Sequence, residues 1–178
     1  MGAISANSGL VRRVAFPREV LVFSNVLHAC VQFAIEMGLF AIILLIAGSP
    51  FLPWLPVVIL ISVLLAIFAS GFALALSTLS VYFRDITYLW TIFNQVWFFL
   101  TPVVYAPSVV QDRAPVWAND LLRLNPMSAF VNTYRDLLYD ATSPSLPRIG
   151  AMAIASFASL AAGWAIFNRM GRRLPEEV

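Results

Sequence analysis

The hydrophobic positions of the chain fall into four long apolar stretches, which short polar or charged segments separate. The stretches cover residues 20–47, 55–79, 86–104 and 149–168. Each contains roughly the 20 apolar residues with which an α-helix crosses the hydrocarbon core of a bilayer. The pattern therefore predicts an all-α fold, a polytopic membrane helix bundle with four transmembrane helices, formed by residues 1–178 as a single domain.

The segment between the last two stretches, residues 105–148, is hydrophilic but has a helical pattern of its own. Asn125 followed by Pro126 is typical of a helix start, because asparagine caps free backbone N–H groups and proline suits the first helical position. Apolar residues then recur at helical spacing at Met127, Phe130, Val131, Tyr134, Leu137 and Leu138. A helix of about 15 residues is too short to span the bilayer. We therefore expect a short re-entrant or interfacial helix on the outer side.

A line of polar residues runs along the first apolar stretch. It consists of Asn25, His28, Gln32 and Glu36, whose steps of 3, 4 and 4 residues place them on one helical face. A carboxylate in lipid is costly, so Glu36 should face other helices or water, or be protonated. Two roles stay open for this line: hydrogen bonds between helices, or a direct part in a transport path. Because the chain has one histidine, His28 is not expected to bind a metal, and no metal site is predicted.

The third apolar stretch follows the charged pair Arg84-Asp85 directly and is rich in aromatic residues. Several of its side chains are expected to share one helical face, namely Trp90, Phe93, Asn94, Trp97 and Thr101. One interpretation is an aromatic belt at the membrane interface combined with core packing. The other is the lining of a path, because flat aromatic faces suit sugar rings or lipid chains.

Small residues recur along the second and fourth stretches and predict close contacts between helices. The second stretch has Ala66, Ser70, Ala73 and Ser77, and the fourth has Ala155, Ser159 and Gly163. Small side chains at such spacing let two helix backbones approach closely in a membrane. We interpret both stripes as packing surfaces.

All eleven basic residues are arginines, and their distribution predicts the topology. If residues 1–19 are cytoplasmic, four spans bring the carboxyl end back to that side, and seven of the eleven arginines are then cytoplasmic. The outer arginines are offset by aspartates at positions 112, 120, 136 and 140. The positive-inside rule therefore predicts a multi-pass membrane protein with both termini in the cytoplasm.

The absence of lysine excludes one important site from this chain. A GxxxxGK[ST] loop needs its lysine to bind ATP phosphates, so ATP and magnesium are not expected to bind here. HExxH, GxSxG and paired-cysteine metal signatures are absent as well, so no catalytic residue is predicted. The net charge of +2 is too small to indicate nucleic acid. A glycosyltransferase acting on a lipid-linked sugar remains a minor alternative.

Four segments carry a resemblance to a known family. FPREV at 16–20, SVYFRDITYLW at 80–90, FFLTPVVY at 98–105 and LNPMSAFVNTYRDLL at 124–138 resemble the permease subunits of ABC-2-type exporters, closest to the branch that exports O-antigen or teichoic acid. The resemblance extends over residues 7–173. It implies a protein of the bacterial cytoplasmic membrane that works as a homodimer with two separate ATPase subunits, which bind the ATP and magnesium. Because family members have six membrane helices, this chain is expected to lack the first two.

The resemblance also implies roles for individual residues. A cytoplasmic coupling segment, residues 7–19, would dock on the ATPase through Arg12, Arg13, Phe16, Pro17, Arg18 and Glu19. Arg84 and Asp85 would begin the fifth helix of the family at the cytoplasmic face. The channel would be lined by Trp90, Phe93, Asn94, Trp97 and Tyr105. An external gate would contain Pro102, Asn125, Pro126, Phe130, Tyr134 and Arg135.

The function that the resemblance implies is ATP-driven export of a lipid-linked polysaccharide or cell-wall glycan. In this interpretation the partners are the ABC ATPase, a second permease copy, membrane lipid and the glycan substrate. Two alternatives stay open: a permease for a drug or a lipid, and a truncated fragment that transports nothing.

Overall fold

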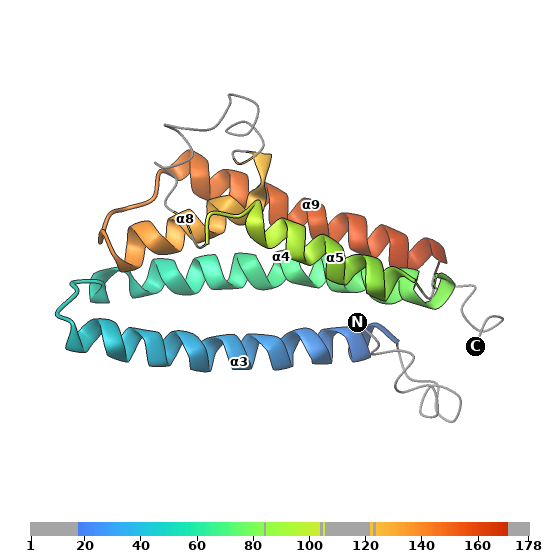
Figure 1. Cartoon of the computed structure of the whole chain (residues 1–178), viewed down its shortest axis with the longest axis horizontal. Coiled ribbons are helices and arrows are strands. Elements are labelled where there is room, and N and C mark those ends of the chain that lie inside the picture. The colour runs from blue at the N-terminus through green and yellow to red at the C-terminus, as the bar shows by residue number, and fades with distance from the viewer. Residues whose placement is uncertain (1–17, 84, 104, 106–121, 123, 171–178) are drawn as a thin grey trace.

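The computed structural model describes residues 18–83, 85–103, 105, 122 and 124–170, and every regular element in this part of the chain is a helix (Figure 1). The elements are α3 (Arg18–Ile46), η1 (Leu52–Trp54), α4 (Leu55–Tyr82), α5 (Ile86–Phe99), α8 (Pro126–Leu138) and α9 (Leu146–Met170). Three of the helices are long and apolar enough to cross a membrane: α3, α4 and α9. The predicted all-α, polytopic membrane architecture is confirmed.

Within the predicted third span, 86–104, the structure has a helix, α5, that ends before the apolar stretch does. Helix α5 has 14 residues, about 21 Å at 1.5 Å per residue, which is less than the roughly 30 Å of hydrocarbon. The chain turns at Leu100 and Thr101 because Pro102 disfavours helical backbone in the residue before it. The apolar run continues past this turn, so hydrophobicity alone could not reveal the break.

Two short helices take the place of that span. α5 runs back along α4 from the end where α4 finishes, and α8, of 13 residues, continues toward the opposite end (Figure 1). At that opposite end the Ser49 hydroxyl, just after α3, donates a hydrogen bond of 3.1 Å to the carbonyl of Leu138. The two helices together are about as long as α4.

Helices α4 and α9 form the closest helix pair in the described structure. A Cβ atom added to Gly163 would lie 2.1 Å from the carbonyl oxygen of Gly71, and one added to Gly71 would lie 2.3 Å from the backbone of Ser159. The Ser159 hydroxyl also donates a hydrogen bond of 3.0 Å to the carbonyl of Phe68. The contact uses Ser159 and Gly163 of the predicted α9 stripe, whereas on α4 it is centred on Gly71, next to Ser70 of the predicted stripe.

Helix α3 packs much less tightly. It runs antiparallel to α4 (Figure 1), and a cavity of about 1040 Å³ lies between the two helices. Its lining is mostly small or apolar and includes Ala29, Cys30 and Gly38 from α3 and Ala66 and Ala73 from α4. Most of α3 is therefore exposed within the described chain.

The two ends of the described chain lie at one end of the helix bundle. The start of α3 and the end of α9 are close to the turn between α4 and α5 (Figure 1). The hydroxyl of Tyr82, at the end of α4, donates a hydrogen bond of 2.6 Å to the carbonyl of Met170. This arrangement agrees with termini on one side of a membrane, and the assignment of that side to the cytoplasm stays a prediction.

Candidate functional site

The side chain of Asn125 connects α5 to α8. Its Oδ1 accepts hydrogen bonds from the Met127 backbone N–H at 3.0 Å and from the Trp97 indole N–H at 2.9 Å. Its Nδ2 donates to the Leu100 carbonyl at 3.2 Å and to the Thr101 hydroxyl at 3.1 Å. All four hydrogen-bonding positions of the amide are thus used. The predicted helix cap at Asn125 is confirmed, and we call this set of contacts the α5–α8 joint.

The joint supplies hydrogen-bond partners for backbone groups that would be unpaired where a helix breaks inside a membrane. The last carbonyls of α5 and the first N–H groups of α8 have no partners within their own helices. Without water in the bilayer core, each unpaired group costs several kcal/mol. Asn125 serves both helix ends, and Arg135 adds a hydrogen bond of 3.0 Å from Nη2 to the Pro102 carbonyl. Thr101 and Pro102 are buried at this point.

The apolar side of α8 packs on the long helices, as its amphipathic pattern predicts. Phe130 and Leu137 are fully buried. The hydroxyl of Tyr134 lies 2.8 Å from the Ser62 hydroxyl of α4, and its ring makes an edge contact with Phe33 of α3 at 6.2 Å between centroids. Burial raises the pKa of Tyr134, and the hydrogen bond with Ser62 lowers it in part. Helix α8 therefore contacts both α3 and α4.

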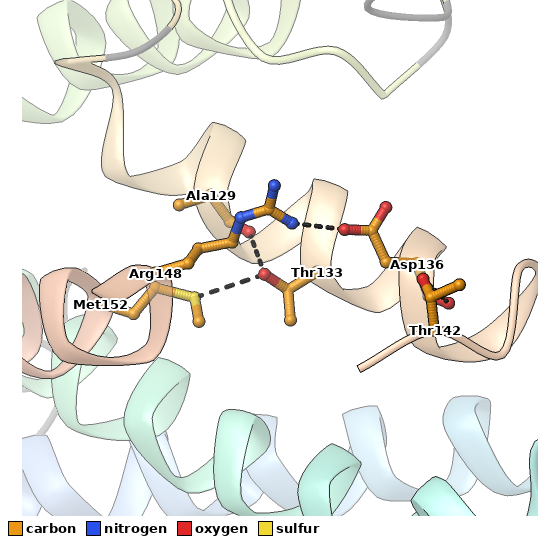
Figure 2. A network of polar contacts seen from close by, with 6 residues as sticks. All are labelled: Ala129, Thr133, Asp136, Thr142, Arg148 and Met152. Atoms are coloured by element: carbon orange, nitrogen blue, oxygen red, sulfur yellow. Dashed lines mark hydrogen bonds and ion pairs between the residues drawn. The ribbon is translucent and has the colours of Figure 1, made fainter. Parts of the chain in front are cut away.

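A polar network joins α8 to the start of α9 (Figure 2). The Arg148 guanidinium forms an ion pair with Asp136, and the Thr142 backbone N–H donates to the Asp136 carbonyl at 2.9 Å. One turn away, the Thr133 hydroxyl donates to the Ala129 carbonyl at 2.7 Å and lies 3.8 Å from the Met152 sulfur. The network fixes the turn between the two helices.

The aromatic side of α5 is a packing surface. Trp90 and Trp97 are half-buried, and their rings lie 5.9 and 5.4 Å from the ring of Phe72 on α4. Phe93 packs on both tryptophans and keeps half of its surface exposed. Core packing, one of the two predicted roles, thus accounts for most of these contacts. A cavity of about 320 Å³ still borders Trp90 and Trp97.

A second surface of α5 is exposed and polar, and sequence reasoning identified only one of its members. We call it the polar face of α5. It consists of Thr87, Thr91, Asn94 and Gln95, all exposed. The hydroxyl of Thr91 bonds back to the Thr87 carbonyl at 3.0 Å. The steps of 4 and 3 residues from Thr87 to Asn94 are the pattern that indicates this face. Asn94, predicted to share the aromatic side of α5, lies instead on the exposed polar face.

The predicted polar line on the first span lies on the exposed side of α3. We call Asn25, His28, Gln32 and Glu36 the polar row of α3, and all four are exposed. Gln32 Nε2 donates a hydrogen bond of 3.1 Å to Glu36 Oε1, and Asn25 Nδ2 donates to the Leu21 carbonyl at 3.2 Å. No described helix covers this row.

Several of the predicted coupling and channel residues lie at the ends of the described segments or beyond them. Arg12, Arg13, Phe16, Pro17 and Arg84 lie outside the described residues. Arg18 and Glu19 begin α3, but their side chains are not described. Asp85 is exposed immediately before α5, and the Tyr105 hydroxyl donates a hydrogen bond of 3.1 Å to the Phe99 carbonyl, next to the α5–α8 joint. The coupling and lining roles of these residues stay predictions.

The chain is similar to known membrane transport proteins. Residues 4–139 match the family model described as ABC-2 type transporter. The O-antigen export system permease protein RfbA of Klebsiella pneumoniae is 26% identical over 172 residues, which are 96% of this chain and 64% of that protein. RfbA of Myxococcus xanthus is 29% identical over 183 residues, covering 99% of this chain and 67% of that protein.

The matched region includes α3, α4, α5, the α5–α8 joint and α8. The chain spans 64% of the length of the Klebsiella relatives. A family model that covers most of the chain, with these permeases as relatives, establishes that the chain belongs to the ABC-2 type transporter family.

Proposed function

We propose that this chain is the transmembrane subunit of an ATP-driven exporter, which moves a lipid-linked polysaccharide out across the bacterial cytoplasmic membrane. The observation that carries the proposal is the similarity to O-antigen export permeases over 96% of the chain. A separate ABC ATPase subunit would bind ATP and magnesium, since this chain has no lysine for a phosphate loop. A second permease copy would complete the transporter.

The path of the substrate would follow the polar face of α5. Hydroxyl and amide groups of Thr91 and Asn94 can exchange hydrogen bonds with sugar hydroxyls as a chain slides past. The exposed half of Phe93 offers a flat surface for sugar rings elsewhere on the same helix. Trp90 and Trp97 would act mainly by holding α5 against α4, because their rings pack on Phe72.

The movement that opens this path would occur at α8. Residues 7–19 would transmit the movement of the ATPase, and α8 would shift as a rigid body together with α5 to open the external gate. Arg135 and the α5–α8 joint support this assignment, because both connect α8 to the end of α5. Tyr134 would hold the closed arrangement against Ser62.

The proposal is tested by glycan export in bacterial cells that carry this gene and display a surface polysaccharide. Thr91→Val combined with Asn94→Leu should reduce surface glycan about tenfold without lowering the amount of permease in the membrane. Leu89→Ala and Val96→Ala are matched controls, because both side chains are exposed on α5 away from its polar face. Normal export by the double variant would remove α5 from the path.

A permease for a drug or a lipid is the second candidate. The apolar cavity of about 1040 Å³ between α3 and α4 favours it, because its lining suits a hydrocarbon chain. In that case the same cells would keep normal surface glycan when the gene is deleted, and accumulation of a lipophilic dye would change instead. A fragment without function would alter neither.

A further inference from the structure

We propose that the polar row of α3 lines the same hydrated path as the polar face of α5, from the opposite side, and that it hydrogen-bonds uncharged, hydroxyl-rich segments of the substrate. The identity of the substrate rests on the proposed function. The hydration of the row does not depend on it.

The position of the row within the span is the first argument. Gln32 and Glu36 lie near the middle of α3 (Arg18–Ile46), at the depth of the bilayer centre. A carboxylate and a carboxamide at this depth are too costly to face lipid tails. The other side of α3 already faces α4, where Cys30, Phe33 and Met37 line the cavity. The row must therefore face water, a polar substrate or another protein.

The neighbourhood of the row is the second argument, and it favours water or a polar substrate. The cavity of about 320 Å³ is bordered by Val22 and Asn25 of α3, by Phe72 of α4, and by Trp90 and Trp97 of α5. Helices α3 and α5 therefore flank one groove on α4, and Asn25 of the row opens into it. On α5 the groove is lined by Trp90 and Trp97, and Asn94 of the polar face follows Trp90 by about one helical turn. A polar surface on each of the two helices that border one groove is the arrangement that a path between them requires.

The chemistry of the row is the third argument, and it indicates the class of ligand. Asn25, His28 and Gln32 can each donate and accept hydrogen bonds, and Gln32 is held in place by Glu36 at 3.1 Å. The row has no arginine, so it is poorly suited to a phosphate headgroup. Neutral donors and acceptors at successive turns match a chain of sugar hydroxyls. A sliding chain also needs contacts that are individually weak.

Thiol labelling of the full-length chain in native membranes tests the hydration directly. In a Cys30→Ala background, Gln32→Cys and Glu36→Cys should react with a charged, membrane-impermeant methanethiosulfonate. Val31→Cys is the matched control, because this side chain is 53% exposed at the same depth but lies off the row. The reacting species is the thiolate, which forms in water and not in lipid, so we expect rates about tenfold or more above the control. Row cysteines no faster than the control would overturn the proposal, because lipid or another helix would then cover the row.

Export tests the role of the row toward the substrate. Gln32→Leu and Glu36→Leu should each reduce surface glycan at least about fivefold at unchanged membrane levels, whereas Glu36→Gln, which keeps its hydrogen bonds, should reduce it less. Ile35→Leu is the control on the same helix turn. Unchanged export by both leucine variants would overturn the role in the path. If the wild type itself exports no glycan, the proposed function fails, while the labelling rates still decide whether the row is hydrated.

Discussion

The indole N–H of Trp97 donates a hydrogen bond of 2.9 Å to Oδ1 of Asn125. The two residues are 28 positions apart, and the bond joins the end of one short helix to the start of the next. The same tryptophan packs on Phe72 of α4 at 5.4 Å between ring centroids. The joint between α5 and α8 thereby packs on the long helix α4.

Replacement of Asn125 should destabilise the protein more than any other single polar truncation in the described chain. Asn125→Ala removes a helix cap worth about 1 kcal/mol and the partner of the half-buried Trp97 indole N–H, at about 1 kcal/mol or more. Thermal unfolding in detergent should show a clear drop in Tm. Asn168→Ala, at an exposed position of α9, is the control. Equal Tm values for the two variants would show that the joint carries no stability.

The contact between α4 and α9 should not tolerate even one methyl group. Gly163→Ala places a Cβ 2.1 Å from the carbonyl oxygen of Gly71, so the helices must separate, at a cost of about 1–3 kcal/mol or more. Gly150→Ala is a matched control in the same helix, since its Cβ would meet nothing within 4 Å. Unfolding temperatures of the two variants give the comparison. A Gly163→Ala protein as stable as Gly150→Ala would contradict the close packing.

The ion pair of Arg148 and Asp136 should contribute little to stability. Its side chains are 39% and 31% exposed, and pairs open to solvent are worth about 0.2–1 kcal/mol. A double-mutant cycle with Arg148→Ala and Asp136→Ala measures the coupling, which should fall further at high salt. A coupling well above this range would show that the membrane interface shields the pair from solvent.

Tyr134 should make a small contribution to the free energy of unfolding, and this contribution should change with pH only under alkaline conditions. Tyr134→Phe loses the 2.8 Å contact with Ser62, and a hydrogen bond of this kind contributes about 0.5–1.5 kcal/mol. Burial raises the pKa of Tyr134 above its ordinary value of 10.0, so the folded state keeps its proton longer than the unfolded state. Stability is therefore unchanged by this group below about pH 10 and falls above it. The fall should be smaller in Tyr134→Phe, whereas Tyr139→Phe, 70% exposed, should behave like the wild type.

Periodicity and helix-start chemistry predicted much of this architecture. Three long helices coincide with apolar stretches, and α8 begins where Asn125 and Pro126 indicate. The end of α5 could not be predicted in the same way, because the apolar run continues through Pro102 and the compensating hydrogen bonds come from a residue far along the chain. Whether a side chain is buried depends on which other helices pack against it, and the sequence pattern of one helix does not identify those helices.

The candidate site, too, could be predicted from the sequence only in part. The polar row of α3 is visible as a spacing, but its exposure depends on which side of α3 meets α4. The helical spacing places Trp90, Phe93 and Trp97 on one side of α5, but only their contact with Phe72 of α4 shows that the two tryptophans pack inward. On α4, Gly71 rather than the predicted stripe makes the closest approach, because only glycine leaves the backbone bare there.

The backbone contact between Gly71 and Gly163 also limits which parts of the protein can move. With no layer of side chains between them, α4 and α9 cannot slide past each other without breaking atomic contacts along the pair, so they behave as one rigid unit. The movements of a conformational cycle must then occur in the helices that pack on this unit. Helix α3, with a cavity beneath it, and the two-piece unit of α5 and α8 are the parts with freedom to tilt. The pair of α4 and α9 is the fixed reference against which the displacement of these helices would be measured.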